Sequence, residues 1–163
     1  MKKILLFGFL LLAVGITSQA QEISKNAIGL RLGDNKGFGT ELNYQRGLKE
    51  STRLELGLSW HSGSYTNAYK LTGLHEWVWR LEDRFNWYAG AGGGLASIQF
   101  DRKHDYYRTS KSDTYLFAAG VIGIEYNFEI PLLISLDFRP EIGFGDYRDD
   151  LNLDIALGLR YQF

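Results

Sequence analysis

The segment LNLDIALGLRYQF, at residues 151–163, alternates along its whole length between large apolar side chains and small or polar ones. Its odd positions hold Leu, Ile, Tyr and Phe, and its even positions hold Asn, Asp, Ala, Gly, Arg and Gln. A period of two residues is typical of a β-strand whose two faces meet different surroundings. The apolar face therefore meets either the core of a water-soluble barrel or the lipid around a membrane-spanning one.

The start of the chain has the pattern of a secretory signal peptide. A pair of lysines precedes an apolar run at residues 4–16, and the small residues of the SQA triplet end at Ala20. The run is shorter than the roughly 20 residues that a membrane-spanning helix needs, and no stop-transfer pattern follows it, which argues against an uncleaved anchor. We expect a signal peptide at 1–20, cleaved after Ala20 on export, and one domain at 21–163.

Charge and cysteine content exclude several classes of function. Loss of Lys2 and Lys3 with the signal peptide takes the formal net charge from −1 to −3, which argues against a nucleic-acid partner. The chain has no cysteine, so it has neither a disulfide framework nor a thiol nucleophile. The stability of the exported domain must therefore come from burial and strand pairing.

Alternating segments with turn signals between them recur after Gln21, as in an all-β sandwich or barrel. An even number of strands in an up-and-down barrel places both ends of the chain on one side. The connections after the second, fourth and sixth segments are short, and most of the others are longer and more polar, which is typical of bacterial outer-membrane barrels. The eight predicted strands run approximately over 26–33, 38–46, 52–61, 69–81, 86–100, 114–127, 132–144 and 151–163.

The last strand indicates which face is turned inward. Ala156 and Gly158 lie in its middle, where a water-exposed surface gives no reason for small side chains. The interior of an eight-stranded barrel is just wide enough for side chains to fill, so small residues mixed with charged ones are expected there. We expect a paired charge network that fills the lumen and leaves no wide pore. Its predicted members are Arg31, Glu41, Arg53, Glu55, Glu76, Arg80, Glu125, Asp137, Arg139, Glu141, Asp154 and Arg160.

Three segments, LGLRYQF at 157–163, NWYAGAGGG at 86–94 and ISLDFRPEIGF at 134–144, resemble the small outer-membrane β-barrels of the OmpA transmembrane-domain and OmpX kind. The resemblance implies an all-β fold, namely an eight-stranded antiparallel up-and-down transmembrane β-barrel in the outer membrane. It also implies contact with membrane lipid and lipopolysaccharide. The barrel assembly machinery would recognise the final strand, through Leu157, Leu159, Tyr161 and Phe163.

The expected role is structural or surface-interacting rather than enzymatic, with no cofactor and no metal. Asp101 to Asp113 form the longest predicted loop and could contact an extracellular partner, since Tyr and Arg are frequent binding anchors. A lipid A deacylase-like enzyme is an alternative, because Ser59 and His61 share one strand face, although their order is reversed relative to that enzyme. His75 would face lipid and is a second candidate for such chemistry.

Two further interpretations of the barrel are compatible with the sequence alone. A soluble periplasmic, lipocalin-like barrel would turn the apolar face inward around a small ligand, and a narrow channel would conduct ions through the lumen. Asp146, Asp149 and Asp150 could bind Ca²⁺, but their spacing does not supply a full ligand set. The glycines of residues 86–94 could cradle phosphate only if a helix followed them. Glycines that bend the barrel or admit bulky neighbours explain the strand context better.

Overall fold

The computed structural model describes residues 23–33, 39–62, 66–100, 111–144 and 151–163, and these contain eight β-strands. The predicted signal peptide therefore lies outside the described residues, as do most of the predicted loop from Asp101 and the acidic loop at 146–150. The strands are β1 Asn26–Gly33, β2 Thr40–Lys49, β3 Thr52–Ser62, β4 Thr66–Arg80, β5 Phe85–Phe100, β6 Lys111–Asn127, β7 Leu132–Phe144 and β8 Leu151–Gln162.

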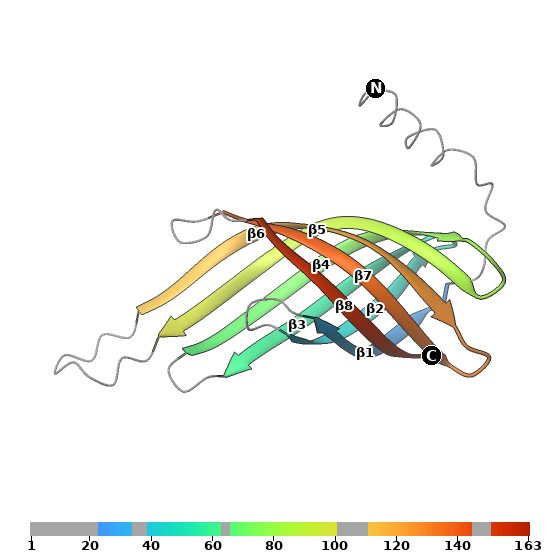
Figure 1. Cartoon of the computed structure of the whole chain (residues 1–163), viewed down its shortest axis with the longest axis horizontal. Helices are drawn as coiled ribbons and strands as arrows, with labels where there is room; N and C mark the ends of the chain where they lie inside the picture. The colour runs from blue at the N-terminus through green and yellow to red at the C-terminus, as the bar shows by residue number, and fades with distance from the viewer. Residues whose placement is uncertain (1–22, 34–38, 63–65, 101–110, 145–150) are drawn as a thin grey trace, which may run out of the picture.

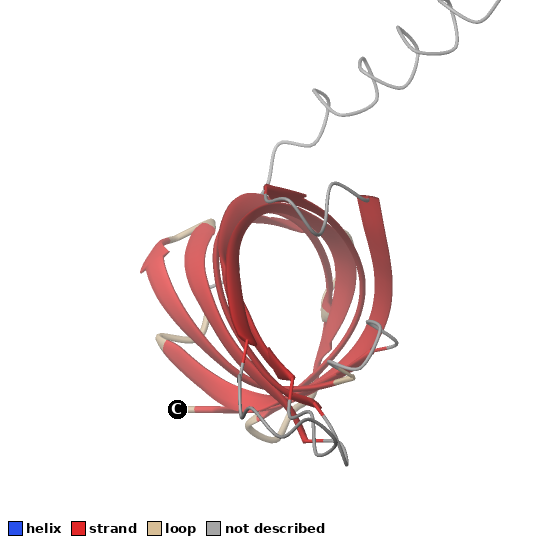
Figure 2. Cartoon of the chain, turned by 90° about the vertical axis from the view of Figure 1, so that its left-hand side faces the viewer, coloured by secondary structure: helices blue, strands red, loops and turns tan. Residues whose placement is uncertain are grey.

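The strands form a closed barrel in which each pairs antiparallel with its neighbours in sequence (Figure 1). The pairing of β1 with β8 closes the ring, with Leu30 opposite Leu159 (Figure 2). The predicted fold class is confirmed, because all eight predicted segments are strands of one up-and-down barrel. The strands β4 and β6 begin earlier than predicted, because Thr66 and Lys111 both pair with Phe100 and extend the β5 ladder beyond the apolar region.

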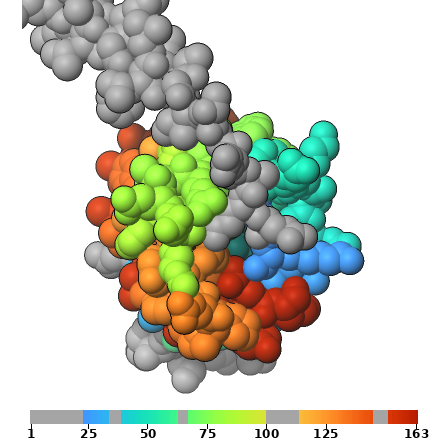
Figure 3. Space-filling view, turned by 90° about the vertical axis from the view of Figure 1, so that its right-hand side faces the viewer, coloured from blue at the N-terminus to red at the C-terminus, as the bar shows by residue number. Residues whose placement is uncertain are grey.

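Short connections lie together at one rim of the barrel, which we call the turn rim. They cover residues 50–51, 81–84 and 128–131. Asn26 and Phe163 meet at the same rim through two backbone hydrogen bonds of 3.1 and 2.9 Å. Figure 3 looks onto this rim, where the start of β1 (blue) lies beside the end of β8 (red).

The outer surface of the barrel is apolar. On β8 the odd-numbered side chains point outward, and Ile155 is 64% exposed. The even-numbered residues from Asp154 to Arg160 on the same strand are buried. A lipocalin-like barrel needs the opposite arrangement, so that alternative does not fit. Within the described residues, no helix is long and apolar enough to cross a membrane.

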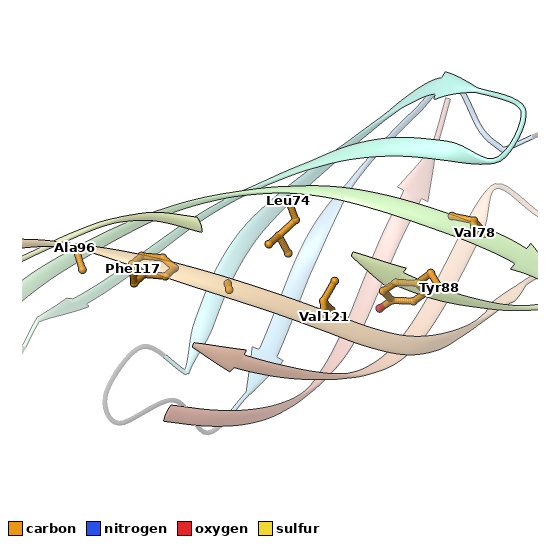
Figure 4. Packing of buried hydrophobic residues seen from close by; sticks show 7 residues of the cluster. Leu74, Val78, Tyr88, Ala96, Phe117 and Val121 are labelled. Carbon is orange, nitrogen blue, oxygen red and sulfur yellow. The ribbon is translucent and has the colours of Figure 1, made fainter. Parts of the chain in front are cut away.

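Part of the lumen is apolar, and this part lies along β4, β5 and β6. Figure 4 shows Leu74 of β4 and Val121 of β6 pointing toward one another, with Tyr88 of β5 nearby. Apolar residues occupy both faces of these strands, so the sequence pattern assigned their inner face less clearly than that of β8. The buried cluster consists of Leu74, Val78, Tyr88, Ala96, Phe117, Ala119 and Val121.

Candidate functional site

The candidate site is the lumen, where charged side chains from opposite walls meet. Nearest the turn rim, Arg53 of β3 binds two carboxylates on different strands. Its Nε atom lies 2.6 Å from Oε2 of Glu76 on β4, and its Nη1 atom lies 2.7 Å from Oε2 of Glu125 on β6. The guanidinium also lies over the ring of Tyr88, 4.7 Å from the centroid. Asn86 completes this group by donating a 3.1 Å hydrogen bond to Glu125.

Glu55 of β3 is the centre of the next group toward the other rim. Its Oε1 atom accepts a hydrogen bond of 2.7 Å from Nη2 of Arg139 on β7. Its Oε2 atom accepts one of 2.7 Å from Gln45 and one of 3.2 Å from Nη2 of Arg160 on β8. One carboxylate therefore joins two arginines from the far side of the barrel.

Arg160 makes further hydrogen bonds to neutral groups. Its Nη1 atom donates to the hydroxyl of Ser135 at 2.7 Å, and its Nε atom donates to the side-chain oxygen of Asn43 at 2.5 Å. Together with Glu55, these partners come from β2, β3 and β7. The end of the last strand is thereby fixed to three other strands through one side chain.

Arg31 of β1 forms a third group with two aspartates. Its Nη2 atom lies 2.5 Å from Asp137 of β7, and its Nη1 atom lies 2.6 Å from Asp154 of β8. Arg139 connects this level to β2, because its Nη1 atom lies 3.1 Å from Oε2 of Glu41. Since the three strands at the closure of the barrel share one guanidinium, this group stabilises the β1–β8 seam as well as filling the lumen.

Lys70 and Glu141 form the lumen pair nearest the rim opposite the turn rim, which we call the loop rim. The Nζ atom of Lys70 on β4 lies 2.8 Å from Oε1 of Glu141 on β7, and it also lies over the ring of Phe117. Lys70 was not among the predicted lumen residues, although it shares strand parity with Glu76 and therefore the same face. The even position of Lys70 on β4, shared with Glu76, is therefore the sequence signal that places it on the inner face.

Arg80 differs from the prediction. It has the same parity as Glu76, but it lies at the end of β4 and its side chain remains 32% exposed, paired with Asp83 at 2.9 Å. Its position beside the 81–84 turn brings a local carboxylate within reach, so it stays at the rim. The remaining predicted members lie buried in the lumen, and each is ion-paired: Arg31, Glu41, Arg53, Glu55, Glu76, Glu125, Asp137, Arg139, Glu141, Asp154 and Arg160.

Glycines on neighbouring strands make room for these side chains. A Cβ atom on Gly57 would lie 2.5 Å from Oε1 of Glu41, and one on Gly90 would lie 2.9 Å from Cγ of Glu76. Both distances are too short for ordinary contacts. Gly90 of β5 therefore agrees with the expectation that glycines of this segment admit bulky lumen neighbours, whereas the nearest atoms to a Cβ on Gly92 or Gly93 would be backbone atoms of the adjacent strands.

The candidate catalytic residues are not assembled into a triad. Ser59 is buried in the lumen and its hydroxyl donates to Glu41 at 3.3 Å, whereas His61 is exposed on the same strand. His75 lies on the outer face, with its ring 4.8 Å from that of Trp77. Among the described residues, no group of three or more His, Asp and Glu side chains is arranged to hold a metal ion.

The lumen geometry is suited to holding the walls of the barrel together. Each described lumen cation lies against a carboxylate from another strand, and several of these strands are far apart in the ring. Buried charges are costly unless they are paired and hydrogen-bonded. The described ion pairs therefore specify which strands face one another, and each charge in them has a partner of opposite sign.

No protein-family model and no curated protein matches the sequence. Solved structures do match the fold. The N-terminal β-barrel domain of Pseudomonas aeruginosa OprF superposes with a TM-score of 0.64 at 14% identity, covering 88% of this chain and 100% of that one. Neisserial surface protein A gives 0.63 at 10% identity, with 85% and 94% covered. Ail of Yersinia pestis gives 0.56 at 16% identity, with 86% and 97% covered.

Proposed function

We propose that this chain, which has the fold of the small eight-stranded outer-membrane barrels, is itself an outer-membrane protein of a Gram-negative cell envelope. The observation that carries the proposal is that charged side chains lie inside the barrel and apolar side chains lie outside, the reverse of a water-soluble protein. Arg139 and Arg160 are almost completely buried inside, whereas Leu157 and Ile155 are about half exposed or more on the outside. A barrel in water would hide its apolar side chains, and a barrel in lipid displays them.

Aromatic side chains at the turn rim support the same arrangement. Trp79 and Trp87 stack across β4 and β5 with centroids 4.3 Å apart, and Tyr161 and Phe163 stack at the end of β8. Aromatic girdles are found where the apolar band of such barrels meets the lipid headgroups. Beyond these rings lie charged residues, among them Arg84, which is paired with Glu129. The turn rim would therefore lie at the periplasmic interface.

We further propose that the protein is exported by a signal peptide at residues 1–20 and inserted by the barrel assembly machinery. Phe163 supports this role for the last strand, because its ring is 62% exposed and contributes little to packing inside the barrel. The side chains of Leu157, Leu159 and Tyr161 lie on the same outer face, where a partner could read them during assembly. Lipid and lipopolysaccharide would surround the finished barrel.

The role we favour is structural, with the segment from Asp101 to Asp113, whose last three residues begin β6, as a surface for an extracellular partner. The ion-paired side chains of the lumen, and the burial of Ser59 against Glu41 while His61 is exposed, support a structural role over an enzymatic one. One solved structure of Ail is a complex with the heparin analogue sucrose octasulfate, so a barrel of this fold can bind an anionic sugar ligand. That complex supports a contact role for a barrel of this size without specifying the partner of this chain.

The deciding experiment is expression of the whole precursor in a Gram-negative host, followed by fractionation and electrophoresis with and without boiling. We expect a band in the outer-membrane fraction that migrates fast when unboiled and slows after boiling, because paired strands resist detergent. N-terminal sequencing of that band should begin at Gln21. Recovery in the soluble periplasmic fraction, with no mobility change, would contradict the proposal.

A further inference from the structure

Three apolar side chains on the inner face of the barrel are buried although they lie close to the turn rim. Ala27 is the second residue of β1, Leu133 is the second residue of β7, and Val78 lies two residues before the end of β4. Arg80, on the same face of β4 but at its last position, remains partly exposed. Inner-face residues this near an open mouth would meet water, so their burial indicates that this end of the lumen is covered.

The segment at residues 23–25, immediately before β1, lies at the covered end. Its first residue, Ile23, is partly buried and packs against the apolar lumen cluster to which Val78 and Tyr88 belong. Val78 and Tyr88 lie together at one end of that cluster, away from Phe117 (Figure 4). Because Ile23 precedes the turn-rim end of β1, its side chain meets the cluster from the turn rim.

Backbone contacts with β2 hold this segment across the inner edge of the rim. The amide of Gly47 donates a 3.0 Å hydrogen bond to the backbone oxygen of Lys25. A Cβ atom on Gly47 would lie 3.1 Å from the backbone oxygen of Ser24. Gly47 has the parity of Gln45, which is buried in the lumen. The segment therefore passes over the inner face of β2 at a point where a larger residue would crowd it.

The side chains around Arg53 lie just inside this end of the lumen. Within the described part of the chain, three of their buried polar atoms have no hydrogen-bond partner: Nη2 of Arg53, Oε1 of Glu76 and Oδ1 of Asn86. Unpaired polar atoms are costly when they are kept from water. Hydration of these atoms therefore favours an open mouth, whereas burial of Ile23 favours a closed one. Opposing contributions of this kind give the segment both an open and a closed position.

We propose that Ile23, Ser24 and Lys25 form a cap that opens and closes the lumen at the turn rim, and that this cap controls the entry of water to the side chains around Arg53. We call this segment the N-terminal cap. Ile23 is its one apolar residue and supplies the contact that keeps the cap closed, whereas Lys25 is exposed. The inference goes beyond the proposed function and does not rest on it, because the cap belongs to the barrel whether or not lipid surrounds it.

The chain has no cysteine, so a single cysteine placed beneath the cap reports its opening. The reporter is Val78→Cys in the full precursor, purified as a folded barrel in detergent and treated with a charged, water-soluble thiol reagent. Adding Ile23→Ser should raise the labelling rate about five-fold or more, because labelling follows the open population and the variant loses the apolar contact that closes the cap. Ile23→Leu should label nearly as slowly as the reporter alone, because it keeps an apolar side chain.

Ile130→Ser is the matched control, because Ile130 is an exposed isoleucine in a turn of the same rim. It should leave the labelling rate unchanged. The boiling shift is measured on every variant to show that the barrel is folded, and Leu133→Cys replaces the reporter if Val78→Cys does not fold.

Two outcomes would overturn the cap. One is a folded Ile23→Ser barrel that labels no faster than the Ile130→Ser control. The other is a reporter that already labels as fast in the folded barrel as in the urea-unfolded chain, since nothing would then close the mouth. Recovery of the unmodified chain in the soluble periplasmic fraction would overturn the proposed function and leave these labelling rates as they are.

Discussion

Glu55 and Arg139 face each other from opposite walls of the barrel, with Oε1 of the carboxylate 2.7 Å from Nη2 of the guanidinium. Their strands, β3 and β7, lie on opposite sides of the ring, so this contact crosses the full width of the lumen. Both side chains are almost completely removed from solvent, and Glu55 also binds Arg160. A single carboxylate therefore binds two buried cations that come from different strands.

Replacement of Glu55 by alanine should strongly destabilise the barrel. The change leaves two arginines with part of their charge uncompensated, which costs about 3–5 kcal/mol for buried pairs. The measurement is the free energy of unfolding in urea with the barrel refolded into lipid vesicles. Arg84→Ala is the control, because it breaks an exposed rim pair with Glu129 and should cost less than about 1 kcal/mol. If the two variants lose the same free energy of unfolding, the buried lumen pairs contribute no more to stability than the exposed rim pair.

The packing of the lumen predicts a contrast between two glycines. A Cβ atom on Gly123 would lie 2.6 Å from Cζ of buried Tyr88 and 2.8 Å from the backbone oxygen of Leu136. Gly123→Ala should therefore cost about 1–3 kcal/mol by overpacking. Gly73→Ala is the matched control, since its nearest neighbour would be a Leu56 methyl at 3.7 Å. Urea unfolding that ranks the two variants in the reverse order would contradict the overpacking expectation.

The proposed membrane location predicts that the cost of a charge on the outer face depends on depth. Leu157 lies at the middle of β8 on the outer face, and Leu157→Arg should cost about 2–4 kcal/mol in vesicles. Leu48→Arg places the same charge at the turn rim, where the cost should fall to about 0–1 kcal/mol. Both positions are exposed to a similar extent, so exposure alone cannot explain a difference. If the two variants unfold alike, the belt around Leu157 is not in hydrocarbon.

The terminal aromatic residue predicts a defect in assembly rather than in stability. Phe163→Ala retains the two backbone hydrogen bonds to Asn26 but removes the exposed ring. We expect a lower yield in the outer-membrane fraction, with unfolding of the purified, refolded barrel shifted by less than about 1 kcal/mol, because an exposed side chain contributes little to stability. Phe144→Ala is the control, because that ring is equally exposed at the loop end of β7. Equal yields for the two variants would remove the proposed role of Phe163.

The sequence predicted the strands and their faces because alternation directly reflects which side faces the lumen and which faces outward. For β1, β3 and β8 the parity of the charged residues was sufficient to place Arg31, Glu55 and Arg160 inside. Parity does not indicate depth along the strand. Arg80 shares the inward face of β4, yet it ends at the rim beside Asp83, and Lys70 on the same face reaches Glu141 across the lumen.

The pairing within the lumen could not be obtained from the sequence. Which arginine meets which carboxylate depends on the stagger of the strands around the ring, and several pairings of opposite charges satisfy the sequence equally well. The apolar cluster containing Leu74 and Val121 was also missed, because β4 and β6 carry apolar residues on both faces. Where both faces are apolar, the alternation that reports the environment disappears.

The hydrogen bonds between Asn26 and Phe163 place the start of β1 beside the residue that follows β8. A short linker could therefore join the two ends, and the polypeptide could be cut instead at the 81–84 turn without removing a single strand pairing. Such a circular permutant should refold in detergent to the same ring of strands. In the cell, however, it would present β4 as its final strand. The permutant would therefore keep the strand pairings that shape the barrel but would no longer end in the strand that we propose is recognised during assembly.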